Sequence, residues 1–273
     1  MNNIYTLQNL LRPEFEPILR HIVDVNDKLG IPYFIAGATA RELLLFHVFG
    51  RDPGRQTKDI DTAIFVSGWA EFDMVKNVML CAGFEATKIA HRLVYEANGL
   101  PVDIIPFGDI ADEHGDIQWP PEHTTTMSVM GFKEAYDAAV LIDIGQRYTL
   151  KVASLAGMAL LKLVAWSERS SSKDASDFLI ILREYAVIYS DRLWDDEIPS
   201  SALNYDIDRQ AAFLLGSDVK SLLSDETKAF LCDLHRLRAE ELVDSMIRVP
   251  TRISDNEKLP MLFDDFWLGV GVG

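Results

Sequence analysis

Hydrophobic and polar positions follow two periods over the first half of the chain, and together they predict an α/β domain. Apolar side chains recur at helical spacing in residues 13–29 and 69–82, and a glycine follows each segment, as expected where a helix ends. Short apolar runs predict strands around these helices, at residues 31–35, 57–66, 91–97, 102–106, 138–144 and 148–152. We expect these strands to form a small mixed sheet flanked by helices, in the α/β (α+β) class.

Beyond residue 152 the pattern is almost entirely helical. Helical spacing of apolar residues covers residues 155–166, a segment that starts near Lys173, residues 208–215 and residues 225–247. The sequence therefore predicts a sheet-containing domain over residues 1–152 and a C-terminal helical domain over residues 153–273. We expect the first helices of the second domain to complete a cleft with the first.

Two stretches fit neither period. Residues 108–126 are rich in acids, histidine, proline and glycine, and we expect a long loop that acts as a substrate-side lid. Residues 264–268 mix acids with aromatic side chains, a composition that suits docking on the body of the protein or on a partner.

A pair of acids, Asp59 and Asp61, opens the predicted strand 57–66. Because side chains alternate faces along a strand, both carboxylates project to the same side of the sheet. Two carboxylates so close repel each other, and they need a cation unless one is protonated or both are exposed. Oxygen ligands of this kind suit Mg²⁺ better than zinc. The pattern also fits two solvated acids at a strand edge.

A third acid, Asp103, lies among apolar residues on a later predicted strand. Asn98-Gly99 joins this strand to the preceding one and is a strong hairpin signal. If this hairpin lies beside the strand of Asp59, it brings Asp103 to the other two carboxylates.

The start of the predicted helix after Gly37 is a candidate anion site. Free backbone N–H groups and the positive end of the helix dipole favour phosphate there. Arg41 lies in the first turn, where a cation opposes the dipole unless it faces an anion; a salt bridge to Glu42 is the alternative. Arg55 and Lys58 lie in the loop before Asp59. Three roles are open to them: they neutralise the carboxylates, they hold a triphosphate, or they are solvated loop residues without a binding role.

The combination of these motifs resembles a known superfamily. The order Gly37-Ala38-Thr39-Ala40-Arg41, then Asp59-Ile60-Asp61, then Asp103 looks like the nucleotidyltransferases related to DNA polymerase β. The later segment 154–177, with Lys162 followed by Asp174 and Asp177, is similar to the AbiEii/AbiGii-type toxin nucleotidyltransferases of bacterial toxin–antitoxin systems. One departure is Ala38, where the family usually carries glycine or serine.

The resemblance implies transfer of a nucleotidyl group from an NTP to a hydroxyl acceptor, with tRNA as an expected acceptor and an antitoxin protein as an expected partner. One or two Mg²⁺ ions would be held by the catalytic residues Asp59, Asp61 and Asp103, and Asp103 would also accept the proton of the acceptor. The residues expected to bind the nucleotide are Gly37, Ala38, Thr39, Arg41, Lys58, Lys162, Asp174 and Asp177. Lys162 lies in a largely apolar helix, where a buried ammonium is costly unless an anion faces it or it reaches water.

Composition limits the partners and the compartment. The formal net charge of −16 disfavours extended nonspecific binding of nucleic acid, because phosphate backbones reward clustered Lys and Arg. The sequence has no apolar run long enough to span a bilayer and does not begin like a signal peptide, so we expect a cytoplasmic protein with no membrane contact. Its two cysteines, Cys81 and Cys232, are expected to be small core residues.

Three other functions remain open at this point. In the first, the acceptor is a cationic small molecule such as an aminoglycoside. In the second, the enzyme attaches the nucleotide to a hydroxyl of a partner protein. The third alternative is a catalytically silent nucleotide-binding module, which the missing serine at Ala38 favours.

Overall fold

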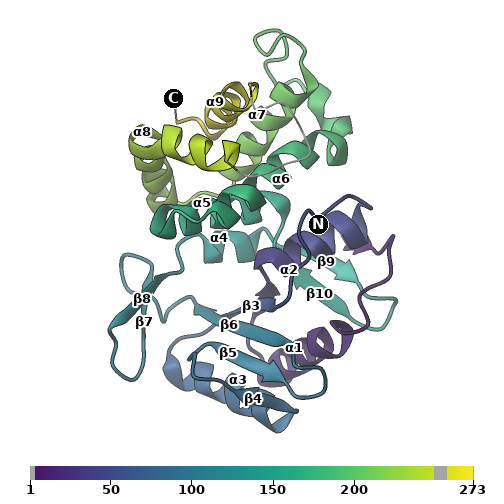
Figure 1. Cartoon of the computed structure of the whole chain (residues 1–273), viewed down its shortest axis with the longest axis vertical. Helices are drawn as coiled ribbons and strands as arrows, with labels where there is room; N and C mark the ends of the chain where they lie inside the picture. Colours follow the sequence, from purple (N-terminus) through teal and green to yellow (C-terminus); the bar gives the residue numbers. More distant parts are fainter. Residues whose placement is uncertain (1–3, 249–256, 273) are drawn as a thin grey trace. The chain divides into compact units, whose positions relative to one another are not determined.

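The computed structural model describes residues 4–248 and 257–272. The chain divides into two compact units, Met1–Ser154 and Leu155–Gly273, whose elements are labelled in Figure 1. Within the described ranges, no helix combines the length and the apolar character that crossing a bilayer requires.

The first unit is built on an eight-stranded sheet with the order β1-β9-β10-β2-β3-β6-β5-β4. Parallel and antiparallel pairs alternate from β1 to β5, with β3 parallel to β6 and antiparallel to β2, and the edge strand β4 is again antiparallel to β5. The predicted α/β class, with a mixed sheet flanked by helices, is confirmed. The strands are β1 (Ile4–Thr6), β2 (Tyr33–Ile35), β3 (Ile60–Phe65), β4 (Phe84–Ala86), β5 (Arg92–Tyr95), β6 (Pro101–Phe107), β9 (Val140–Asp143) and β10 (Thr149–Val152).

Helices α1 (Glu16–Leu29) and α3 (Trp69–Cys81) lie next to each other along one side of this sheet (Figure 1). The apolar positions that predicted α1 are its buried ones, among them Ile18, Leu19 and Ile22. Gly30 ends α1 with a φ of 68°, in the left-handed region that glycine adopts without strain. Helix α2 (Gly37–Glu42) continues into a π-helical segment, Leu43–Val48, and a short helix α4 (Phe132–Asp137) precedes β9.

The segment expected to be a long loop has its own secondary structure. Strands β7 (Asp116–Trp119) and β8 (Thr125–Ser128) pair as an antiparallel hairpin. Its Trp119 is buried against the rings of Trp69, Phe72 and His91, at centroid distances of 5.3, 5.7 and 5.1 Å. The prediction of a long loop without regular structure is therefore wrong, because strand pairing and aromatic packing order a segment whose composition is that of a loop. Its role as a substrate-side lid stays a prediction.

The second unit is helical, as the sequence predicts. Its core contains large buried rings, which are Trp166, Phe178, Tyr185, Phe263, Phe266 and Trp267. The helices are α5 (Leu155–Arg169), α6 (Ser172–Ile188), α7 (Ile207–Lys220), α8 (Asp225–Ile247) and α9 (Leu259–Val270), with a short 3₁₀ helix, Ser190–Trp194.

The acidic and aromatic segment 264–268 belongs to α9 and docks on α7 of its own unit. The two backbones approach closely at a pair of glycines: a Cβ added at Gly216 would lie 2.0 Å from the carbonyl oxygen of Phe266, and one at Gly269 would lie 2.1 Å from that of Phe213. Asp265 pairs with Arg209 of α7 through two hydrogen bonds of 2.7 and 2.9 Å.

The prediction that both cysteines are core residues is wrong. Cys81 and Cys232 are exposed free thiols. Cys81 is the last residue of α3, and Cys232 lies on α8 next to the buried Leu231 but on a different face of the helix.

Candidate active site

Strand pairing brings the three predicted carboxylates together. Asp61 on β3 is in register with Asp103 on the parallel neighbour β6, and Asp59 immediately precedes β3. One carboxylate oxygen from each of the three residues lies within 4.8 Å of the other two. Asp103 is buried, whereas Asp59 and Asp61 are half-buried, so the cluster is open to solvent on the side of the first two acids.

The backbone at Gly37 lies against this cluster. Gly37 has a φ of 60°, and a Cβ added to it would lie 2.0 Å from Oδ2 of Asp61. Any other residue would therefore meet both backbone strain and a clash with the carboxylate. This close approach explains why a glycine stands at the start of α2.

A cation also belongs to the cluster, and sequence reasoning missed it. Arg92 on β5 is in register with Asp103, so that Asp61, Asp103 and Arg92 form a row across three adjacent strands. The guanidinium of Arg92 donates two hydrogen bonds to Asp103, of 2.7 and 2.6 Å, and its Nη2 lies 3.6 Å from Oδ2 of Asp59. The hydrogen bonds to Asp103, which outweigh the effect of burial, raise the pKa of Arg92 above its ordinary value, so this group is always charged.

The donor set fits a divalent metal ion. Three carboxylates whose oxygens converge within 4.8 Å provide the hard, anionic ligands that Mg²⁺ prefers. The guanidinium on Asp103 and Asp59 shows independently that this position attracts positive charge. Asp59, Asp61 and Asp103 would hold the ion.

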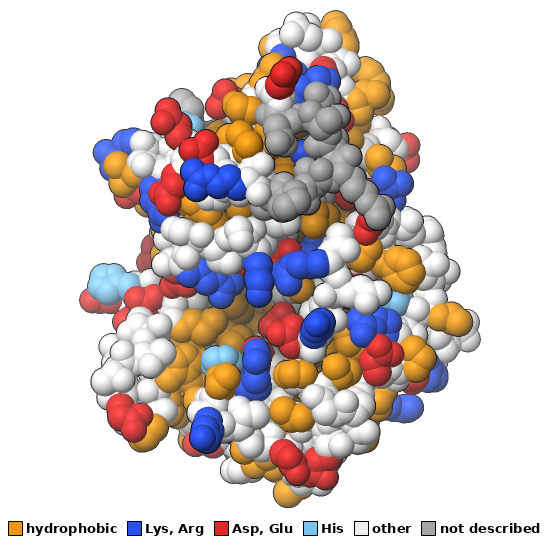
Figure 2. Space-filling view, in the orientation of Figure 1, with side chains coloured by type: hydrophobic (Ala, Val, Ile, Leu, Met, Phe, Trp, Pro, Cys, Tyr) orange, Lys and Arg blue, Asp and Glu red, His pale blue; other side chains and the backbone are white. Residues whose placement is uncertain are grey.

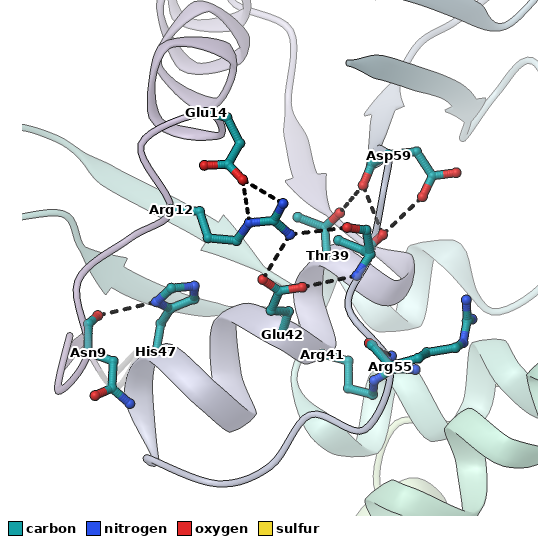
Figure 3. A network of polar contacts seen from close by, with 10 residues as sticks. Asn9, Arg12, Glu14, Thr39, Arg41, Glu42, His47, Arg55 and Asp59 are labelled. Carbon is teal, nitrogen blue, oxygen red and sulfur yellow. Dashed lines mark hydrogen bonds and ion pairs between the residues drawn. The ribbon is translucent and has the colours of Figure 1, made fainter. Parts of the chain in front are cut away.

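Helix α2 holds the loop that carries Asp59 (Figure 3). The hydroxyl of Thr39 donates to the backbone oxygen of Asp59 at 2.9 Å, and Nη2 of Arg41 donates to the backbone oxygen of Arg55 at 3.1 Å. Oε2 of Glu42 accepts from the backbone N–H of Thr57 at 3.1 Å. Three residues of one short helix thus each hold a different position of the same loop.

Thr57 connects this support by α2 to the carboxylate of Asp59. Its hydroxyl lies 2.9 Å from Oδ1 of Asp59 and 3.0 Å from the backbone oxygen of the same residue. Arg12 adds hydrogen bonds to Oε1 of Glu42 at 3.3 Å and to the backbone oxygen of Thr57 at 3.1 Å (Figure 3). Thr57 therefore orients the Asp59 carboxylate, and Arg12, which lies far from it in the sequence, supports Thr57.

These contacts bear on the residues expected to bind nucleotide in the first unit. The side chains of Thr39 and Arg41 are buried and bonded to the loop, and Ala38 is buried as well. Gly37 is half-buried beside Asp61, and Lys58 is exposed one residue before Asp59. A nucleotide contact of each of these five residues stays a prediction.

In the second unit, Lys162 of α5 has the anions that its burial requires. Its ammonium lies 3.0 Å from Oδ1 of Asp174 and 2.8 Å from Oδ2 of Asp177, and both aspartates lie on α6. Arg169 also donates two hydrogen bonds to Asp174, of 2.6 and 2.9 Å. The sequence predicted Lys162, Asp174 and Asp177 as nucleotide contacts, whereas in the structure they form one ion-pair cluster. Their role in nucleotide binding stays a prediction.

The titration of Asp174 reflects this cluster. Burial alone would favour the protonated acid, but the hydrogen bonds from Arg169 and the charge of Lys162 outweigh it and hold the pKa of Asp174 below its ordinary value. Both acids have side chains that are at most 1% exposed. Each of the two carboxyl groups therefore meets a cationic side chain inside the protein.

Charges of both signs are intermingled on the molecular face that Figure 2 shows. The balance is strongly acidic, at −16 for the whole chain. A polyanion would therefore meet repulsion from the protein as a whole.

Comparison with known proteins yields likeness only at the level of solved structures. No protein-family model matches the chain, and no curated protein matches it. A nucleotidyltransferase-like antigenic protein from Paracoccidioides brasiliensis is 17% identical, with 87% of this chain and 94% of that chain covered and a TM-score of 0.43. ANT(2")-Ia in complex with adenylyl-2"-tobramycin is 10% identical, with 64% and 90% covered and a TM-score of 0.40.

A third structure is the lincosamide antibiotic adenylyltransferase LnuA bound to lincomycin, at 13% identity, with 63% of this chain and 98% of that chain covered and a TM-score of 0.38. At these identities and TM-scores the likenesses assign no activity, acceptor or partner to this chain.

Proposed function

We propose that this protein is a Mg²⁺-dependent nucleotidyltransferase that moves a nucleotidyl group from an NTP to a hydroxyl acceptor. The observation that carries the proposal is the convergence of Asp59, just before β3, with Asp61 of β3 and Asp103 of β6, and the backbone of Gly37 lies against Asp61. The order of these motifs is the one that resembles the polymerase β-related superfamily.

The carboxylates divide the work by position. Asp59 and Asp61, the two half-buried acids, would hold metal where a triphosphate can reach it from solvent. Bound Mg²⁺ would neutralise the phosphate charges and the charge that develops on the attacking and leaving oxygens. Asp103, the buried member, would share the metal and also take up the proton of the acceptor hydroxyl.

The reaction balances with these groups. The acceptor oxygen forms a bond to the α-phosphorus of the NTP, the bond from that phosphorus to the α,β-bridging oxygen breaks, and pyrophosphate leaves. The hydroxyl proton passes to Asp103. The family resemblance supports eight further residues as nucleotide contacts. These are Gly37, Ala38, Thr39, Arg41, Lys58, Lys162, Asp174 and Asp177.

The acceptor is a separate question. The resemblance to AbiEii/AbiGii-type toxins implies tRNA as acceptor and an antitoxin as partner. The net charge of −16 favours a cationic acceptor, such as an aminoglycoside, because it attracts cations and repels RNA.

The decisive experiment incubates the purified protein with each α-labelled NTP and Mg²⁺ in the presence of total RNA, an aminoglycoside mixture, or cell protein. Label in RNA supports the toxin-like function, label in a small molecule the antibiotic-modifying function, and label in protein a third acceptor class. Nucleotide binding with no transfer to any acceptor would leave a nucleotide-binding module and refute the enzyme.

Asp61→Asn is the matched variant for this experiment, because it keeps the side-chain size and removes one negative charge. We expect the Mg²⁺-free variant to melt no lower than wild type, since one of three mutually repelling carboxylates is gone. The additional stabilisation by Mg²⁺ and NTP should vanish together with transfer. A variant that melts lower without ligand yet keeps its full ligand-induced shift would show that Asp61 is structural.

A further inference from the structure

Arg92 contacts the same carboxylates that would bind a metal ion. The bidentate contact with Asp103 uses both of its carboxylate oxygens, one at 2.7 Å and the other at 2.6 Å. The same guanidinium reaches Asp59 at 3.6 Å. Two of the three carboxylates that would ligate the metal therefore already face a cation.

This arrangement follows from the strand register. Arg92 pairs with Asp103 across β5 and β6, just as Asp61 pairs with it across β3 and β6. Residues in register on adjacent strands have neighbouring side chains on the same face. The guanidinium is therefore placed beside the carboxylates by the sheet itself.

We propose that Arg92 is an internal counter-ion of the carboxylate cluster, and that a metal ion ligated by Asp103 has to displace the guanidinium of Arg92. An oxygen that accepts a short hydrogen bond from an arginine and a bond to a metal ion has two cations within bonding distance, and these cations repel each other. Arg92 therefore offsets part of the negative charge of the cluster when no metal is bound and weakens metal binding at Asp103. This inference rests on the metal site of the proposed function.

The partial exposure of Arg92 makes the exchange feasible. Its side chain is 31% exposed, against 10% for that of Asp103, so that a displaced guanidinium has solvent to enter while the carboxylate stays in place. Once displaced, the guanidinium is a free donor next to the cluster, suited to an anion such as a phosphate oxygen. Arg92 then couples metal binding to the arrival of an anionic ligand.

The test measures Mn²⁺ binding to the full-length protein by electron paramagnetic resonance, without nucleotide. Arg92→Gln removes the competing cation and should bind Mn²⁺ at least about fivefold more tightly than wild type, because a charge-assisted bidentate pair no longer has to be broken. Arg92→Lys keeps a positive charge without the bidentate geometry and should lie between the two. Arg92→Lys also serves if Arg92→Gln does not fold.

Arg147→Gln is the matched control. Arg147 also pairs with a carboxylate, that of Glu16, but lies in the turn between β9 and β10. In the sheet order β10 is three strands from β6, or about 14 Å at about 4.8 Å per strand. At 0.15 M salt this exceeds the Debye length of about 8 Å, so the control should change Mn²⁺ affinity less than about twofold.

A melting experiment provides the second readout. In EDTA, Arg92→Gln should melt below wild type, because Asp103 is left buried without its cation. Saturating Mn²⁺ should raise the melting temperature of the variant by more than it raises that of wild type.

The outcomes are distinguishable. If wild type binds Mn²⁺ in a manner that depends on Asp61 but Arg92→Gln binds it no more tightly, the counter-ion proposal is overturned and the proposed function stands. If neither protein binds Mn²⁺, the metal site falls and the proposal falls with it. Tighter binding by Arg92→Gln, with no change in Arg147→Gln, supports the exchange.

Discussion

Lys162→Met is the substitution whose effect the structure predicts most directly. The ammonium of Lys162 is the cation shared by Asp174 and Asp177, and the side chains of these acids are 1% and 0% exposed. Methionine has nearly the same length but no charge, so the variant leaves carboxylates inside the protein without this cation. We expect a large loss of stability for a single substitution.

The magnitude follows from the partners that remain. Removing one partner of a buried ion pair costs about 3–5 kcal/mol. Arg169 still pairs with Asp174 in the variant, and the side chain of Lys162 is itself 14% exposed, so the full penalty is not reached. We therefore expect the free energy of unfolding to fall by about 2–3 kcal/mol.

Urea unfolding followed by circular dichroism and tryptophan fluorescence measures this loss. The matched control is Lys173→Met, which removes the same charge from an exposed position on α6 and should change stability by less than about 0.5 kcal/mol. Adding Asp177→Asn to Lys162→Met should recover part of the loss, because one of the two buried carboxylates that lost the ammonium of Lys162 then carries no charge.

The pH dependence gives an independent check. In wild type the pKa of Asp174 is lowered, so this carboxylate contributes stability at neutral pH, and the contribution is lost as the pH falls below about 4 through its lowered pKa. Without Lys162, only Arg169 still offsets the burial of Asp174, so the pKa of this carboxyl is higher in the variant than in wild type. The difference between variant and wild type should therefore shrink as the pH is lowered from 7.5 to 5.

Two results would refute this reasoning. One is an equal urea midpoint for Lys162→Met and Lys173→Met, which would mean that the ion pairs contribute nothing. The other is a stability difference that does not change with pH, which would point to lost packing rather than to the loss of a cation beside the buried carboxylates.

Two further substitutions test the geometry around the carboxylates. Gly37→Ala should lower the free energy of unfolding by about 1–3 kcal/mol and abolish Mn²⁺ binding, because its Cβ would lie 2.0 Å from Asp61. The control Gly30→Ala has a similar φ but no atom within 4 Å, so it should cost only about 1 kcal/mol and leave Mn²⁺ binding intact. Equal effects of the two would disprove the close contact. Thr57→Val should weaken Mn²⁺ binding about three- to tenfold with a stability loss of about 1 kcal/mol, because the hydroxyl beside Asp59 is lost, and Thr57→Ser should restore affinity. Weak binding by both Thr57 variants would contradict a role for the hydroxyl.

The local pattern of residues was sufficient to predict most of the elements. The apolar spacing of 225–247 predicts the bounds of α8, and the glycine after α1 marks its end. The strands that carry Asp61 and Asp103 were predicted because apolar runs and turn residues are properties of neighbours in the sequence. The aspartates of the candidate metal site were therefore found from the sequence, and the sheet brings them together.

The partners of these residues depended on register, which no local pattern reveals. A two-residue turn at Asn98-Gly99 would pair Asp103 with Val94, but the structure closes a longer turn, in which the N–H groups of Asn98 and Gly99 both donate to the carbonyl of Tyr95. Asp103 therefore faces Arg92, two residues earlier on β5. A shift of two residues keeps every side chain on its face, so the alternation of apolar and polar positions cannot distinguish the two registers.

Long-range contacts decided what the remaining polar residues do. Thr39 and Arg41 have the sequence character of phosphate ligands, yet the tertiary structure turns their side chains toward the loop before Asp59. Lys162 and Asp177 lie on different helices, and only the packing of α5 against α6 makes them an ion pair. The sequence thus determined which chemical groups the protein carries and on which elements, while the tertiary structure decided which charge meets which, because a buried ion is stable only beside a partner that folding brings to it.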